Sequence, residues 1–315
     1  MPQPSAPKNA SRSCLPAGVW GVVATPFQGS TLDVDLDSLA ELVEHYQTIG
    51  ATGLTVLGVF GEAAALTPAE RVDVLETVVD STSLPLVVGV TALATRPAID
   101  EVLAAQKAAG NRLAAVMIQA SSAKPETVIA HLDAIHRATG ASVVLQDYPL
   151  ASGVSISTAA LASVVNACEY VIAVKAEAPP TSVAIAELSA AVGVSIFGGL
   201  GGQGLLDELT AGAAGAMTGF SYPEALVACV GAWQDGGYKA AERELRPYLP
   251  LVNFEQQAKV ALAIRKECLR ERGLIKDSGV RAPAAGFPEV LRESMGVHLA
   301  EAAEALDART TVGSF

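Results

Sequence analysis

The chain has 315 residues, of which 50% are apolar and 17% are charged. This composition excludes an intrinsically disordered chain, a collagen-like chain and a small disulfide scaffold. Its 33 acidic and 21 basic residues give a net charge of -12, which would repel the phosphates of nucleic acids and of anionic membranes. We therefore expect no nucleic acid and no membrane among its partners.

Residues 1–17 predict a flexible N-terminal tail, because they combine Pro, Ser and scattered basic residues without a long apolar run. They lack the apolar core of a secretory signal, and no other segment approaches the roughly 20 apolar residues of a membrane-spanning helix. The four cysteines show neither disulfide spacing nor metal-site spacing. Together these features favour a cytoplasmic protein.

From about residue 18, short β-branched apolar runs alternate with longer amphipathic segments, which is typical of βα units around a buried parallel sheet. The Thr-Pro-Ala-Glu sequence at 67–70 has the residues of a helix capping box. Strands are predicted at 18–25, 53–57, 86–90, 114–119, 142–147, 171–175, 195–197 and 214–218. Eight such units predict a (β/α)8 barrel over 18–235, since a doubly wound open sheet usually stops at about five or six strands.

Beyond residue 235 the strand patterns end. Three segments separated by Pro and Gly, at 239–248, 254–272 and 288–306, predict helices. We therefore expect a helical C-terminal extension over 236–315. The alternating charges at 265–272 predict a solvated helix face within it.

Lys175 has the placement expected of a catalytic residue. Reactive groups of a barrel lie at the carboxyl ends of its strands, and Lys175 ends the apolar run at 170–175. A desolvated lysine loses its proton readily and can attack a ketone, so Lys175 is a candidate Schiff-base nucleophile; an ion pair with Glu177 is the structural alternative. The other lysines fall in the tail, in helical patterns or in loops, where solvated amines belong: Lys8, Lys107, Lys124, Lys239, Lys259, Lys266 and Lys276.

Glu177 follows Lys175 by two residues, and both side chains share a face if the strand continues that far. The carboxylate is a candidate general acid or base beside the imine. The alternatives are that it neutralises Lys175 or caps the following helix.

The segment 58–62, Gly-Val-Phe-Gly-Glu, follows the second predicted strand. Its glycines allow a tight turn whose amide groups converge on a small anion such as a substrate carboxylate. A plain connection between strand and helix is the alternative.

A second glycine cluster at 198–202 follows the seventh predicted strand. It lacks the lysine and hydroxyl of a P-loop and the spacing of a dinucleotide fingerprint, so we expect no nucleotide cofactor, and the glycines leave room for a substrate. The histidines lie in predicted helices and form no metal-binding pair, so we expect no metal site.

In order and spacing, these segments resemble the dihydrodipicolinate synthase and N-acetylneuraminate lyase superfamily over roughly residues 18–306. Besides Lys175 and the turn at 58–62, the resemblance rests on the segments GVVATPF at 21–27, LTPAER at 66–71 and GAAGAMT at 212–218. It implies a class I Schiff-base aldolase or dehydratase on a (β/α)8 barrel, assembled as a homo-oligomer, a dimer or a tetramer. The substrate would be a 2-oxo acid and the only cofactor a covalent imine with Lys175.

The resemblance also implies that the amides of Val59 and Phe60 bind the carboxylate of the 2-oxo acid. The full set of candidate substrate-binding residues is Gly58, Val59, Phe60, Gly61, Gly198, Gly199 and Thr218.

Several positions depart from the synthase pattern. The threonine pair of its proton relay, its tyrosine pair, the tyrosine of its YxxP motif and its substrate arginine align with Val59 and Phe60, Ser121 and Ser122, Gln146, and Ala151. These replacements lack the needed proton or charge, so neither dihydrodipicolinate synthase activity nor sialic acid lysis is expected. The QDxP, KxE and GVFGEA patterns are more similar to the branch containing L-2-keto-3-deoxyarabonate dehydratase.

In that branch's chemistry, Lys175 condenses with the C2 ketone, the iminium acidifies C3, and the C4 hydroxyl leaves. The candidate proton carriers are Glu177, Tyr148 and a water held by Gln146, in that order. Two alternatives remain open. One is a class I aldolase that releases pyruvate through the same imine, and the other is a non-catalytic protein that binds 2-oxo acids or serves as a scaffold.

Overall fold

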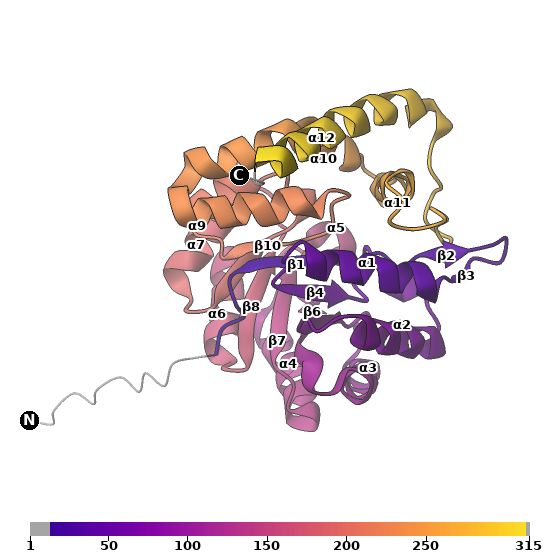
Figure 1. The fold of residues 1–315 in the computed structure, drawn as a ribbon. Coiled ribbons are helices and arrows are strands. Elements are labelled where there is room, and N and C mark those ends of the chain that lie inside the picture. The colour runs from indigo at the N-terminus through magenta and orange to yellow at the C-terminus, as the bar shows by residue number, and fades with distance from the viewer. Residues whose placement is uncertain (1–12, 313–315) are drawn as a thin grey trace, which may run out of the picture.

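Eight parallel strands close into a barrel in a computed structural model of the chain, which describes residues 13–312 (Figure 1). Each strand pairs with its neighbours, in the circular order β1-β10-β9-β8-β7-β6-β5-β4. Their bounds are β1 Gly18–Val22, β4 Gly53–Val56, β5 Leu86–Gly89, β6 Leu113–Gln119, β7 Val143–Asp147, β8 Val171–Ala176, β9 Ser195–Gly198 and β10 Gly215–Thr218. The predicted (β/α)8 barrel is therefore confirmed.

Helices follow the barrel strands and cover their outer face (Figure 1). They are α1 Leu36–Thr48, α2 Pro68–Ser81, α3 Thr95–Ala109, α4 Pro125–Thr139, α6 Thr158–Ala167, α7 Thr181–Ala191, α8 Leu205–Thr210 and α9 Pro223–Leu245. The short helix α5 Pro149–Ser152 and the single turns η1 Ala63–Ala65, η2 Gly110–Arg112 and η3 Leu200–Gly202 lie in connections. Helix α2 begins with the predicted capping box, in which Thr67 and Glu70 hydrogen-bond each other's amide groups.

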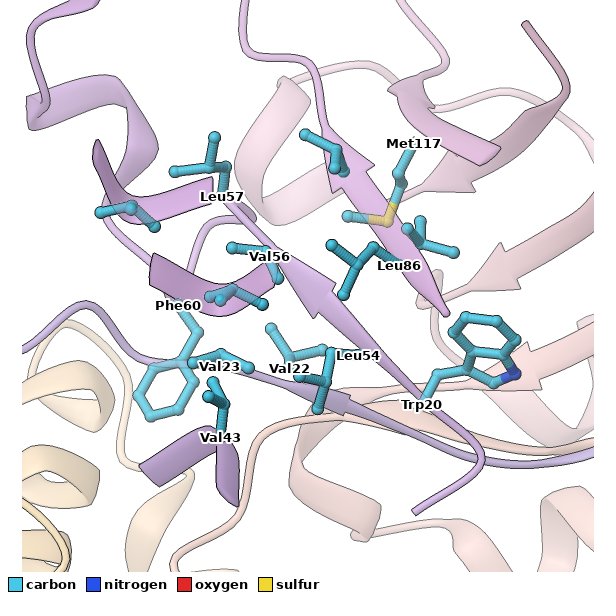
Figure 2. Packing of buried hydrophobic residues seen from close by; sticks show 14 of the residues in the cluster. Trp20, Val22, Val23, Val43, Leu54, Val56, Leu57, Phe60, Leu86 and Met117 are labelled. Atoms are coloured by element: carbon cyan, nitrogen blue, oxygen red, sulfur yellow. The ribbon is translucent and has the colours of Figure 1, made fainter. Parts of the chain in front are cut away.

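Apolar side chains of neighbouring strands pack together in the barrel, and Figure 2 shows Trp20, Leu54 and Leu86 among them. The Trp20 ring lies against Gly53, where a Cβ atom would come within 2.4 Å of it. A glycine is therefore needed at this position to admit the largest side chain of the core.

The C-terminal helices share a core with the barrel. They comprise the turns η4 Arg246–Tyr248 and η5 Glu289–Leu291 and the helices α10 Leu249–Glu255, α11 Ala261–Glu271 and α12 Arg292–Val312. One apolar cluster joins Val19 of β1 and Ala216 of β10 to Ile264 of α11 and Met295 of α12. The extension is therefore packed on the barrel and has no separate core among the described residues.

Two boundaries of the extension differ from the sequence-based expectation. Helix α9 runs through the expected boundary at 235, with a break in its helical backbone at Gly237. The helix expected at 254–272 is two helices, because α10 ends at Glu255 and α11 begins at Ala261. A short antiparallel pair, β2 Phe27–Gln28 with β3 Asp33–Val34, was not expected and lies beside α11 (Figure 1).

The end of the predicted tail is packed against the barrel. Leu15 is buried, its amide donates to the carbonyl of Ile172 at 3.2 Å, and its carbonyl accepts from Ser195 Oγ at 2.5 Å. The prediction of a flexible segment is therefore wrong for residues 13–17, because Leu15 anchors them to β8 and β9. Residues 1–12 lie outside the described part. Within the described part, no helix has the length and apolar character needed to cross a bilayer.

Candidate active site

Lys175 lies near the carboxyl end of β8 and is only 6% exposed. Its neighbour across the strand pair is Gln146 of β7. The Lys175 Nζ atom is 3.2 Å from Glu177 Oε2. The predicted nucleophile is therefore held beside a carboxylate at the end of the barrel where active sites of this fold are built.

Glu177 joins the candidate catalytic side chains into one network. Its Oε2 atom, besides contacting Lys175, accepts a hydrogen bond from Gln146 Nε2 at 2.7 Å. Its Oε1 atom accepts from the amide of Leu200 at 3.4 Å. The carboxylate is buried and is fixed by these donors, so it lies beside any atom bonded to Lys175 Nζ.

A cavity of about 450 Å³ opens above these residues. All four candidate catalytic side chains line it: Lys175, Glu177, Tyr148 and Gln146. Of the candidate substrate-binding residues, Gly58, Val59, Phe60 and Thr218 line it as well. Gly61, Gly198 and Gly199 are not part of its wall. The volume is in the range of small-molecule sites.

Gly198 and Gly199 make room for protein carboxylates. A Cβ atom at Gly199 would lie 2.2 Å from Glu177 Oε1, and one at Gly198 would lie 1.8 Å from Glu208 Oε2. The space that the sequence suggested for a substrate is therefore filled by Glu177, which lines the cavity, and by Glu208, which lies outside its wall.

The turn at 58–62 has two amide groups available for a ligand. Among the described residues, the amides of Val59 and Phe60 donate to no other protein group. Thr25 Oγ1 holds the turn through the carbonyl of Gly61 at 2.7 Å. Glu62, in a left-handed conformation, turns its carboxylate away toward α11. The arrangement suits a small anion placed at the two amides.

Thr218 ends β10 and also faces the cavity. Its Oγ1 atom accepts a hydrogen bond from the amide of Gly201 at 2.7 Å. The hydroxyl proton is therefore directed by this contact and is available to a ligand.

Helix α11 and the connection before it contribute cavity residues that were not expected from the sequence. Gln256, Lys259 and Arg265 line the cavity from the segment that begins at the end of α10. The expectation of a solvated face at 265–272 is wrong, because α11 packs across the barrel mouth. The apolar spacing of Ile264 and Cys268, both fully buried, was the available sign of a packed helix.

Lys266 is a second buried lysine, with 0% exposure, which corrects the expectation that every lysine except Lys175 is solvated. Its Nζ atom donates to Glu62 Oε1 at 2.8 Å and lies 4.2 Å from the centre of the Phe27 ring. Lys266 is not part of the cavity wall. Its charge is therefore structural, whereas Lys175 faces the cavity.

Burial raises the pKa of several acidic groups around Glu177. Burial, with a contribution from Glu177, raises the pKa of Asp147 to about 6. Burial also raises the pKa of Tyr148, so its phenol remains protonated at neutral pH. Burial raises the pKa of Glu208 to about 7 although the hydrogen bond from Thr181 lowers it. The cavity thus has a phenolic proton donor in its wall.

Among residues 13–312, no cluster of three or more His, Cys, Asp and Glu side chains is arranged for a metal ion.

Comparison with known proteins decides the family, because a model of the dihydrodipicolinate synthetase family matches residues 15–302. The chain belongs to this family. It is 30% identical over 279 residues to an L-2-keto-3-deoxyarabonate dehydratase from Azospirillum brasilense, across 84% of this chain and 88% of that protein. It is 39% identical to a trans-O-hydroxybenzylidenepyruvate hydratase-aldolase from Pseudomonas putida over 90 residues, 26% of this chain and 27% of that protein. A dihydrodipicolinate synthase structure from Rhodopseudomonas palustris has a TM-score of 0.84 and 29% identity, across 92% of this chain and 99% of that one.

The turn at 58–62 carries Val59 and Phe60 where the resemblance implies the threonine pair of the synthase. The Val59 side chain is 52% exposed, and Phe60 extends toward Gly219, where a Cβ atom would lie 2.4 Å from its ring. Figure 2 shows Phe60 at the edge of the apolar cluster. The turn therefore offers amide groups but no side-chain proton. Of the other departures from the synthase pattern, Ser121, Ser122 and Ala151 are not among the residues of the cavity wall, whereas Gln146 is.

Proposed function

We propose that this chain is a Schiff-base lyase in which Lys175 attacks the C2 ketone of a 2-oxo acid. The observation that carries the proposal is the buried Lys175 amine, 3.2 Å from Glu177 Oε2, in the wall of a cavity of about 450 Å³. The lyase family to which the chain belongs supports it.

Imine formation requires a neutral amine. Glu177 Oε2 is placed to take the proton of Lys175 Nζ and return it to the departing C2 oxygen. The amine and the ketone then form a protonated imine and one water molecule. The substrate carboxylate binds the amides of Val59 and Phe60.

The protonated imine draws electrons from C3, so a base can remove a C3 proton. Glu177 is the first candidate, since its carboxylate contacts the nitrogen that becomes bonded to C2. The resulting enamine expels the C4 hydroxyl as water once a proton is supplied. Tyr148, whose phenol burial keeps protonated, is the first candidate for that donor. Gln146 orients Glu177 and can hold a water in the same region. Hydrolysis of the imine frees Lys175.

We propose a 2-keto-3-deoxy sugar acid, such as L-2-keto-3-deoxyarabonate, as the substrate. The dehydratase from Azospirillum brasilense supports this choice because its match covers most of both chains. The loss of hydroxyls at Val59 and Phe60 also argues against the synthase relay. Cleavage of the C3–C4 bond through the same imine, which releases pyruvate, is the second candidate, and the shorter match to a hydratase-aldolase supports it.

We further infer, from the family, a homo-oligomer of two or four chains acting in the cytoplasm on a small 2-oxo acid. The sequence spacing of the four cysteines, which suggests no disulfide framework, supports a reducing compartment.

The test is product analysis with L-2-keto-3-deoxyarabonate. A semialdehyde formed with loss of water indicates dehydration, and pyruvate release indicates an aldolase. Lys175→Met should abolish either reaction, whereas Lys259→Met, which removes another lysine of the same cavity, is the matched control. A Lys175→Met protein that retained turnover while Lys259→Met lost it would overturn the assignment of the nucleophile.

A further inference from the structure

Helix α11 places one arginine over the cavity. Arg265 belongs to the cavity wall, and its guanidinium carbon lies 5.4 Å from the centre of the Phe60 ring. Only 12% of the side chain is exposed. The guanidinium thus faces the cavity from the C-terminal extension, whereas Lys175 enters it from the barrel.

Within the described part of the chain, the side chain of Arg265 donates no hydrogen bond. Its nearest carboxylate oxygen, Glu255 Oε2, is 3.7 Å from Nε, which is too long for a hydrogen bond. Glu255 instead accepts hydrogen bonds from the hydroxyl and amide of Ser221. The Arg265 Nε atom is buried and, apart from the ion-pair contact with Glu255, has no hydrogen-bond partner among residues 13–312. Leaving a buried guanidinium without hydrogen bonds is costly, so Arg265 favours a ligand that brings an acceptor to it.

Gln256 provides a second unused donor at the same place. Its Nε2 atom is buried and unpartnered within the described part of the chain. A Cβ atom at Gly201 would lie 1.8 Å from Gln256 Nε2 and 3.4 Å from Arg265 Nη2. Both donors therefore approach the same glycine and can reach one ligand group.

We propose that Arg265 and Gln256 form a subsite that binds oxygen atoms at the far end of the substrate, on the carbons beyond C3. This inference rests on the proposed function, because the C2 carbon is placed by Lys175 and the C1 carboxylate by the turn at 58–62. A guanidinium and a carboxamide both donate to hydroxyl and carboxylate oxygens. The subsite selects 2-oxo acids with an oxygenated end over those with an alkyl end.

Matched five-carbon acids test the subsite. The probes are 2-oxopentanoate, 5-hydroxy-2-oxopentanoate and 2-oxoglutarate, which end in a methyl, a hydroxyl and a carboxylate group, with pyruvate as the reference. The readout is the concentration of each acid that gives half-maximal borohydride-trapped adduct on Lys175. Each value is divided by the value for pyruvate in the same protein, so that a general loss of imine formation cancels.

We expect the wild-type protein to favour at least one oxygenated acid over 2-oxopentanoate by about ten-fold or more. Arg265→Met should remove most of that preference, and Gln256→Leu part of it. Arg270→Met is the matched control, because Arg270 is on the same helix but pairs with Glu267 and Glu271. If 2-oxoglutarate has the lowest half-maximal concentration, the natural substrate is a dicarboxylic acid. If the hydroxy acid has the lowest, the substrate is a sugar acid.

Equal ratios for all three acids in the wild-type protein would overturn the subsite, and this measurement does not depend on the variants folding. An Arg265→Met protein that lost the pyruvate adduct as strongly as the oxygenated adducts would also overturn it, since Arg265 would then act at C1. Failure to trap pyruvate on wild-type Lys175 would instead contradict the proposed function itself.

Discussion

Lys266 of α11 donates a hydrogen bond to Glu62 Oε1 at 2.8 Å across 204 positions of sequence. The amide of Arg281 donates to the other oxygen of the same carboxylate at 2.9 Å. The turn that offers amides to a ligand is therefore fixed by the C-terminal extension. The helix that makes this contact also carries Arg265 into the cavity.

Lys266→Met should be strongly destabilising, because it leaves the Glu62 carboxylate buried without its cation. Removing one partner of a buried pair costs about 3–5 kcal/mol. Denaturant unfolding measures the change in free energy. The control is Lys239→Met, which breaks an exposed pair with Glu242 and should cost less than about 1 kcal/mol. Similar losses in both variants would contradict a structural role for the Lys266–Glu62 pair.

Gly199→Ala should inactivate the protein while leaving it folded. The added Cβ atom would lie 2.2 Å from Glu177 Oε1, so Glu177 must leave its position beside Lys175. A misplacement of this size costs about 100-fold in turnover. Gly193→Ala is the matched control, because no atom lies within 4 Å of its Cβ position. Full turnover in Gly199→Ala would mean that the position of Glu177 is unimportant.

Glu177→Gln should slow both imine formation and removal of the C3 proton, because the same carboxylate serves both steps. Wild-type protein in deuterated water should exchange the methyl protons of pyruvate, which NMR detects. The variant should exchange them at least about 100-fold more slowly, in line with the loss of a general base. Tyr148→Phe should still exchange them, yet fail to expel the C4 hydroxyl. Wild-type exchange in Glu177→Gln would assign the base to another group.

Glu208→Gln should raise stability at alkaline pH. Burial raises the pKa of Glu208 to about 7, whereas an unfolded chain titrates this group near 4.3. The folded state therefore holds its proton more tightly, and the stability contributed by the group falls as pH rises from about 4.3 to about 7. The variant should be more stable than wild type at pH 8 by about 1 kcal/mol or more, and the difference should shrink at pH 4. The same difference at both pH values would contradict a neutral Glu208.

The barrel and the buried position of Lys175 at a strand end could be predicted because their signals are local. The β-branched run that ends at Lys175 specifies both the strand and the strand end. The packing of α11 over the cavity could not be predicted in this way. Whether the charges of α11 face solvent depends on Glu62, which lies far away in the chain. Leu15 likewise reads as part of a polar tail until its partners Ile172 and Ser195 are in place.

The glycine pair Gly198 and Gly199 illustrates a different limit. A glycine indicates that there is no room for a Cβ atom at its position, but the sequence does not identify the group that occupies that space. Here Glu208 and Glu177 fill the space, and both come from other strand ends or helices. The unused donors of Arg265 and Gln256 also required coordinates, because an unpaired group is recognised only when all its neighbours are known.

The site of imine formation most directly tests whether Lys175 is the nucleophile. The protein is incubated with pyruvate, reduced with borohydride, digested and analysed by peptide mass. We expect a single reduced adduct on the peptide that contains Lys175. An adduct on Lys259 or Lys266, or no adduct at any pyruvate concentration, would contradict it.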